Sequence, residues 1–307
     1  MDPLADVLAL LGTTGHVSAT LAAGGRWAVR FPPPAGIKFN AVRRGHCRLR
    51  VDGVAAPIDL AEGDCYLLTR PVSYVLAGAA ELPPEPAEPI FTAATGGLAR
   101  AGTGDEVLLV GAAFTFTARA RDLLLDSLPP VIHVPAALPE AAALHRSVVE
   151  IDTELRQARA GATLVAEHLA LVMLIRILRL HLDRGRPTGW LAGLADPVVG
   201  PALRAMHARP AQRWTVAQLA GVAAVSRSTL AARFRAVVGR GPLDYLTAWR
   251  VELAAARIRR GGDTLATIAR EVGYGSESAL SVAFKRVTGR SPGAYRQSAR
   301  PGDRYPA

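Results

Sequence analysis

Cysteine is scarce in this sequence of 307 residues. Only Cys47 and Cys65 are present, and they are not spaced as CxxC. Two thiols cannot form the set of disulfides that supports small secreted domains, and their spacing does not suit a zinc or dithiol centre. We therefore expect the protein to occupy a reducing compartment, the cytoplasm.

Long apolar runs without charge are also missing. The most apolar stretch, residues 164–182, carries side chains that are costly in hydrocarbon. These are Glu167, His168, Arg176, Arg179 and His181. The first residues include Asp2 and Asp6 rather than the basic start of a secretory signal peptide. We expect no membrane partner, and a short amphipathic helix over residues 7–11.

Acidic residues are few in the last third of the chain. Residues 200–307 hold 18 Lys or Arg and 6 Asp or Glu, a net charge of +12, whereas residues 1–199 hold 18 and 20. A concentrated positive field attracts a polyanion and releases its counterions on contact, as in nucleic-acid binding. A merely soluble basic surface, or one that binds anionic lipid, would carry the same charge.

Strand and turn patterns fill residues 27–76, and helical periodicity begins at Pro139. In residues 47–51 apolar side chains alternate with two arginines, which indicates a half-buried strand, and Asp52-Gly53 marks a hairpin. The proline-rich residues 83–89 are predicted to form an exposed loop, with strands resuming at residues 107–110 and 113–116.

One apolar stripe runs along the predicted helix over residues 164–182. It consists of Leu164, Leu171, Ile175, Leu178 and Leu182. The stripe is either a dimer seam, centred on residues 171–182, or a face packed on its own domain. Pro187, Gly189 and Gly193 then indicate an interdomain linker over residues 187–199.

The C-terminal third contains one pattern twice. In the first copy Thr215 caps a helix that ends at Gly221, and Ser226 caps a second helix with Leu230 and Phe234 on its buried face. The spacing predicts a helix-turn-helix whose second helix faces the major groove.

The second copy has the same order of caps and buried residues. Thr264 opens its first helix, Gly273 ends it, and Ser276 caps a second helix that buries Leu280 and Phe284. Between the copies, Pro242 starts a linking helix that ends near Gly261-Gly262. If both units enter one face of B-DNA, their recognition helices should lie about 34 Å apart.

Residues 264–296 include IAREVGYGSESALSVAFKRVTGRSPGAYR, which resembles the signature segment of the AraC/XylS family of transcription regulators. The preceding WTVAQLAGVAAVSRSTLAARFRAVVGRGPLDYLTAWRVELA is similar to the first half of that family's DNA-binding domain. The resemblance implies double-stranded DNA as the partner, and RNA polymerase as a second one for an activator. The candidate DNA-contacting residues are Arg227, Ser228, Arg235, Ser276, Glu277, Ser278, Ser281, Lys285 and Arg286.

The segment WAVRFPPPAGIKFNAVRRGHCRLRVDG resembles the cupin-like sensor domain of many family members. The resemblance implies an α+β protein: a cupin-like β-barrel with accessory helices at residues 1–186, then an all-α DNA-binding domain at residues 200–300. It also implies a small-molecule effector in the barrel, and we expect a homodimer.

Three alternatives concern the N-terminal domain. A metal-dependent cupin enzyme needs converging histidines, but His46 stands alone, with Arg48 where a second imidazole would be expected. We therefore expect no metal, no other cofactor and no enzyme activity. Cys47 and Cys65 could form a redox switch, although small buried cysteines are commoner. An inert β-domain in a purely architectural DNA-binding dimer is the third hypothesis.

Overall fold

The computed structural model describes residues 3–10, 14–78, 82–115, 128–157, 159–184 and 189–298. Contacts between Cα atoms divide the chain into two compact units. One unit is Thr13–Pro187, and the other combines Met1–Gly12 with Thr188–Ala307. We call them the β unit and the helical unit.

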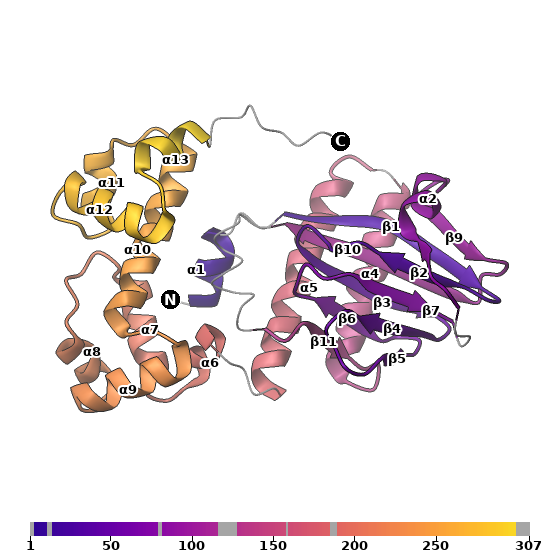
Figure 1. Cartoon of the computed structure of the whole chain (residues 1–307), viewed down its shortest axis with the longest axis horizontal. Helices are drawn as coiled ribbons and strands as arrows, with labels where there is room; N and C mark the ends of the chain where they lie inside the picture. Colours follow the sequence, from indigo (N-terminus) through magenta and orange to yellow (C-terminus); the bar gives the residue numbers. More distant parts are fainter. Residues whose placement is uncertain are drawn as a thin grey trace. The chain divides into compact units, whose positions relative to one another are not determined.

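The β unit contains two sheets that enclose an apolar core (Figure 1). The six-stranded sheet has the order β11 (Val131–Val134), β6 (Cys65–Leu68), β3 (Ile37–Arg44), β10 (Val107–Thr115), β1 (Thr14–Gly24), β9 (Leu98–Gly102). The five-stranded sheet has the order β5 (Ile58–Leu60), β4 (Cys47–Val51), β7 (Tyr74–Ala77), β2 (Ala28–Phe31), β8 (Glu85–Pro86). Neighbouring strands pair antiparallel apart from β1 with β9 and β2 with β8.

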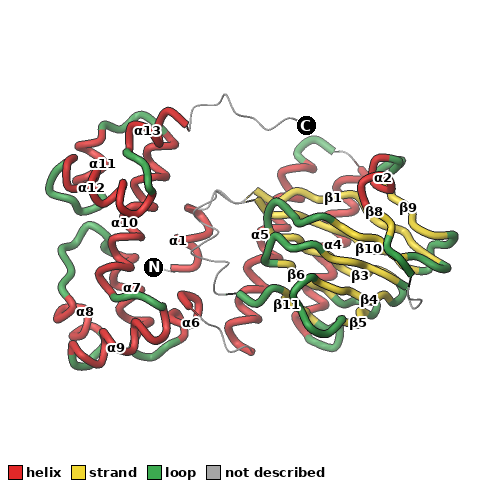
Figure 2. The backbone as a smooth tube through the Cα atoms, in the orientation of Figure 1, coloured by secondary structure: helices red, strands yellow, loops and turns green. Residues whose placement is uncertain are grey.

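Two long helices, α4 (Pro139–Gln157) and α5 (Ala162–Arg184), cover the outer face of the six-stranded sheet (Figure 2). This cover explains why all four residues of β6 are buried. Tyr66 and Leu68 lie in the core between the sheets, so Cys65 and Leu67 alternate toward the opposite face. The α+β fold class and the cupin-like character of this unit agree with the expectation.

The predicted strand over residues 47–51 is confirmed as β4, which alternates buried and exposed residues from Cys47 to Val51. The predicted loop at residues 83–89 is wrong, because it contains β8 and the start of α2 (Ala87–Thr92). Pro89 fits α2 because the first helical turn does not need its missing N–H. Residues 107–115 form the single strand β10 rather than two, and Phe116 lies outside the described residues.

The helical unit is organised along α10 (Pro242–Arg260), the predicted linking helix (Figure 1). The first helix-turn-helix consists of α8 (Val216–Val222) and α9 (Arg227–Val238), and the second of α11 (Leu265–Glu271) and α12 (Glu277–Thr288). The unit also contains α1 (Pro3–Leu10), α6 (Gly189–Ala195), α7 (Val199–Ala208) and α13 (Pro292–Ser298). None of the described helices combines the length and apolar character needed to span a bilayer.

Two boundaries differ from the expectation. Helix α6 lies inside the stretch predicted as a linker, and its Gly193 packs against Leu203 and Val238, where a Cβ would come within 3.1 Å of both side chains. Helix α1 contacts α7 and α10 and buries Leu4, Val7 and Leu8. It therefore groups with the helical unit rather than with residues 13–187.

The two helix-turn-helix turns share a left-handed residue in corresponding places. Helix α8 continues past Gly221, so the predicted end there was early, and Ala224 has φ +54°. The amide after it, that of Val225, donates to Ala220 O; in the second copy Tyr274 donates to Ala269 O, after Gly273 at φ +90°. Because an L side chain is strained at positive φ, the first turn carries a cost that the second avoids.

We expect substitutions at Ala224 and Gly273 to have opposite effects on the free energy of unfolding. Ala224 is exposed, so Ala224→Gly should raise the free energy of unfolding by about 0.5–1 kcal/mol through relief of backbone strain. Gly273→Ala adds the same strain, and its Cβ would lie 2.7 Å from Ala211 Cα. We expect a loss of about 2 kcal/mol from that crowding.

Thermal and urea unfolding of the two variants and the parent would test this prediction. Destabilisation by Ala224→Gly, or a neutral Gly273→Ala, would contradict it.

Candidate nucleic-acid interface and apolar pocket

Both second helices of the repeats begin with a serine cap. The backbone amide of Thr229 donates to Ser226 Oγ at 3.1 Å, and that of Ala279 donates to Ser276 Oγ at 3.1 Å. A capping hydroxyl satisfies an amide that the helix itself leaves unpaired. The predicted caps are therefore confirmed, and Ser276, proposed as a DNA contact, has this structural role.

Each of these helices has one apolar anchor face. Leu230 and Phe234 in α9, and Leu280 and Phe284 in α12, are fully buried. Phe234 packs edge-on against Tyr245 of α10, and Phe284 packs in the same way against Tyr295 of α13. With one face anchored, the opposite face of each helix is left to solvent.

The structure places the candidate DNA-contacting residues on these outward faces or at their N-termini. Ser281 is half-buried, and the following are exposed: Arg227, Ser228, Arg235, Ser276, Glu277, Ser278, Lys285 and Arg286. Val282 of α12, at 71% exposure, is the most exposed large apolar side chain of the described residues. An apolar group on such a face suits contact with a thymine methyl.

Helix α9 is tied to the start of α7 through Asp196. This buried carboxylate accepts from the amides of Val198 and Val199 at 2.9 Å and forms an ion pair with Arg233 of α9 at 2.8 Å. Burial alone would raise the pKa of Asp196, but the two amide hydrogen bonds and Arg233 together lower it. The carboxylate therefore stays charged at neutral pH and holds α9 in place.

A hollow of about 450 Å³ lies beside the N-terminus of α12. Arg213 and Arg270 line it together with Ser276 and Glu277. Both arginines are exposed, and a helix N-terminus flanked by cations favours an anionic oxygen such as that of a phosphate. Sequence reasoning missed both arginines, although their nearness to the caps Thr215 and Ser276 was a usable signal.

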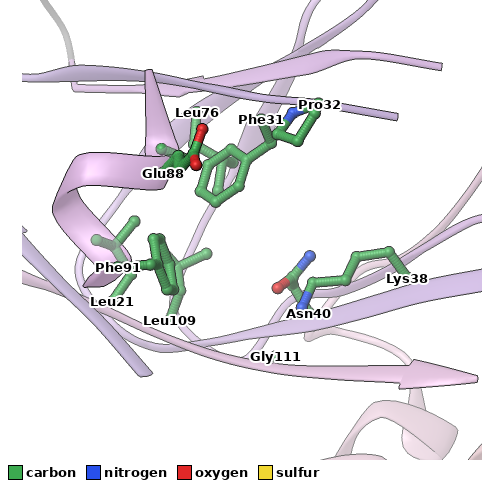
Figure 3. Close-up of a pocket in the computed structure, with 11 residues that line it drawn as sticks. Leu21, Phe31, Pro32, Lys38, Asn40, Leu76, Glu88, Phe91, Leu109 and Gly111 are labelled. Carbon is green, nitrogen blue, oxygen red and sulfur yellow. The ribbon is translucent and has the colours of Figure 1, made fainter. Parts of the chain in front are cut away.

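The β unit contains an apolar pocket of about 270 Å³ between its two sheets (Figure 3). Its lining residues come from strands of both sheets and from α2: Leu21, Phe31, Pro32, Lys38, Asn40, Leu76, Ala87, Glu88, Phe91, Leu109 and Gly111. Phe31 stacks on Tyr74 at 4.7 Å between ring centroids and meets Phe91 edge-on at 5.7 Å. The aromatic side of the pocket is thus held by ring packing.

The pocket has one polar end. Lys38 and Asn40 lie side by side on β3, away from the Glu88 carboxylate (Figure 3). Asn40 is buried, and its side-chain amide lies beside the hydroxyl groups of Tyr66 and Tyr74. Burial lowers the pKa of the Lys38 ammonium to about 8. A hydrogen-bond acceptor placed between these donors could accept from both and would stabilise the ammonium.

The two cysteines do not have the surroundings of reactive thiols. Cys47 is free and lies in the core between the sheets, whereas the free Cys65 alternates to the opposite face from Tyr66. Burial, with a smaller effect of Asp64, raises the pKa of each thiol to about 12. The redox-switch hypothesis gains no support from these positions, because the thiolate is the reactive form.

His46 is exposed. Among the described residues, no group of three or more His, Cys, Asp or Glu side chains is placed to hold a metal ion.

Helices α9 and α12 are both capped, expose basic side chains and are joined by one linking helix. Together with a cupin-like unit in the same chain, they define a DNA-binding regulator. Comparison with known proteins agrees: a family model described as Cupin matches residues 2–183, and one described as a helix-turn-helix domain matches residues 219–298. The chain belongs to the AraC-like transcription regulators. It is therefore a regulator and not an enzyme.

Several relatives match almost the whole chain, and two of them are 60% identical to it. A putative AraC-like transcription regulator of Streptomyces lividans is 60% identical over 299 residues, covering 97% of this chain and 98% of that one. Another, from Streptomyces antibioticus, is 60% identical over 303 residues, covering 98% and 100%. Among solved structures, the unsaturated fatty acid-bound ToxT of Vibrio cholerae is 14% identical, with a TM-score of 0.37 and coverage of 93% and 96%.

Proposed function

We propose that the protein binds a specific operator with α9 and α12 in successive major grooves and changes this binding when a small molecule occupies the β unit. The observation that carries the first part is the pair of capped helices whose anchored faces leave the candidate contact residues exposed. The positive charge of the C-terminal third supplies the salt-dependent part of the affinity.

The candidate residues divide by chemistry. Arg227 and Ser228 open α9, while Glu277, Ser278 and Ser281 lie on α12. We assign base contacts to these positions, with Glu277 accepting from a cytosine amine. Arg235, Lys285 and Arg286 lie one to three turns further along their helices, and we assign phosphate contacts to them.

Arg227→Ala should weaken binding to the operator by about 1–3 kcal/mol if the arginine reads a guanine. The measurement is the dissociation constant on an operator selected from upstream DNA, and on a random duplex of equal length, at several salt concentrations. Arg260→Ala, at the exposed end of α10, removes the same charge as a control. Equal losses on both duplexes would make Arg227 a phosphate contact instead.

The pocket between the sheets is our proposed effector site. Its wall is mainly apolar, while Lys38 and the Asn40 amide mark one polar end. This arrangement fits a small molecule with an apolar body and one acidic or acceptor group. An inert β unit would instead leave operator affinity unchanged by any small molecule.

Two fluorescent probes test the chemistry of the pocket. 1-Anilinonaphthalene-8-sulfonate carries an anion, whereas N-phenyl-1-naphthylamine is its uncharged counterpart. Lys38→Met should weaken binding of the sulfonate about tenfold, the usual size of a lost charged hydrogen bond, and leave the neutral probe nearly unchanged.

Arg30→Met, which removes an exposed cation of β2 that does not line the pocket, is the matched control. Equal effects of Lys38→Met on the two probes would contradict the proposed polar end.

A second copy of the chain is our proposed partner for the exposed apolar residues of α5. Leu178 of the predicted stripe is fully buried within the β unit, but Leu164 is 58% exposed and Val172 is 39% exposed. Covering such side chains in a dimer would remove apolar surface from water. The dimer would place two helical units on one operator.

We therefore expect the wild type to sediment as a dimer and the double variant Leu164→Glu, Val172→Glu to sediment as a monomer. Glu154→Gln on the neighbouring helix α4 is a control that should keep the dimer. A wild-type monomer at micromolar concentration would contradict the prediction.

A further inference from the structure

The two helix-turn-helix units touch through a loop as well as through α10. Residues 209–214 join α7 to α8, and this loop lies against the turn of the second unit. A Cβ on Gly273 would be only 2.7 Å from both Cα and O of Ala211. Backbone therefore meets backbone at this point, and only glycine allows the approach.

Arg250 of α10 holds the loop at this contact. Its Nε donates to the carbonyl oxygen of Pro210 at 2.7 Å, and its Nη2 donates to that of Gln212 at 2.7 Å. Its guanidinium carbon also lies 5.7 Å from the ring centroid of Tyr274, which follows Gly273 in the second turn. One planar cation thus joins the linking helix, the loop and the second unit.

The loop is also rigidly joined to the first unit. Trp214 is buried, and its Nε1 donates to the carbonyl oxygen of Arg209 at 3.1 Å. The Arg209 guanidinium carbon lies 5.1 Å from the centroid of the Trp214 ring. Because Trp214 precedes the α8 cap Thr215, displacement of the loop would also displace the start of α8.

If α10 alone joined the two helix-turn-helix units, they could bend and twist relative to one another. A second contact, off the axis of that helix, removes this freedom. Burial lowers the pKa of Arg250, because the guanidinium loses hydrating water at this position. Its hydrogen bonds to two carbonyls offset that cost.

We propose that Arg250 is a positioning residue that, through the loop it holds, fixes the separation of α9 and α12 and hence the spacing of the two DNA segments that they read. The inference rests on the proposed function, in which both helices contact bases. Arg250 would thus contribute to operator specificity without contacting a base.

Spin labels measure the separation without DNA. Labels would be attached at Ala232→Cys on α9 and Val282→Cys on α12, both exposed, while the buried native thiols react slowly. We expect a narrow distribution of distances between the two labels in the parent and a clearly broader one in Arg250→Ala. Arg250→Lys should give an intermediate distribution, because lysine keeps the charge but cannot donate to both carbonyls in the planar geometry of the guanidinium. An unchanged distribution in Arg250→Ala would overturn the proposal.

The fold of each variant would be checked by its thermal unfolding transition. If Arg250→Ala does not fold, Tyr274→Leu and Arg250→Gln provide the same comparison. Each weakens one side of the junction, and an unchanged distribution in both would also overturn the proposal.

A series of operators tests the functional consequence. The segments read by α9 and α12 would be moved apart or together by one and two base pairs. The parent should prefer one spacing at least tenfold, and Arg250→Ala should reduce this preference to threefold or less. Arg260→Ala, which removes an equal charge away from the loop, should lower affinity at every spacing and keep the preference.

The outcomes separate the two proposals. A parent without preference for any operator over random DNA refutes the proposed function. A selective parent whose spacing profile is unchanged by Arg250→Ala refutes only the role of Arg250.

Discussion

The helical unit depends on one helix that belongs to two apolar cores. The first half of α10 buries Tyr245, Leu246 and Trp249, and its second half buries Ala255 and Ile258 in the cluster that includes Leu280. His207 of α7 stacks on Trp249 and pairs with the Tyr245 hydroxyl at 2.7 Å, while burial lowers the pKa of this histidine to about 4. The neutral imidazole can therefore stay inside the first core. Each recognition helix then needs only one anchored face, and its other face is free to carry the residues that we propose contact DNA.

The two copies share a plan but do not present the same chemistry to DNA. The two caps of the first copy are 11 positions apart, and those of the second copy are 12 positions apart. Because Ala224 and Gly273 occupy corresponding places, the added residue is Gly275, where a Cβ would lie 3.8 Å from an Arg213 nitrogen in the loop of the first unit. Helix α9 begins with Arg227, whereas α12 begins with Glu277 and exposes Val282. The two helices should therefore prefer different bases, which suits an asymmetric operator segment for each chain.

Features with local causes could be predicted from the sequence. The cap hydroxyls and the Leu and Phe anchors depend on neighbours within one or two turns, and all were found where expected. Features that depend on distant partners were missed. Strand β1 is rich in small residues and exists through pairing with β10 and β9. Gly193 was interpreted as a sign of a linker, but it is small because Leu203 and Val238 pack against it. The polar end of the pocket and the place of Arg250 also required tertiary structure, since no sequence spacing relates Asn40 to Phe91 or Arg250 to Gly273.

Regulation by the pocket requires a difference in free energy, not occupancy alone. A ligand that binds equally well to the DNA-free and DNA-bound forms cannot change operator affinity, however tightly it binds. Coupling between two sites is also reciprocal, so an effector that shifts operator affinity must have its own affinity shifted by the operator by the same factor, commonly about 5–150-fold. In our proposal, the buried Asn40 amide and the Lys38 ammonium would give the pocket a preference among ligands. That preference becomes regulation only if filling the pocket changes the population of chains that can bind the operator. The proposed role of Arg250 limits how that change can occur, because with the separation of α9 and α12 fixed an effector would have to move the helical unit as a whole rather than bend it between its two recognition helices.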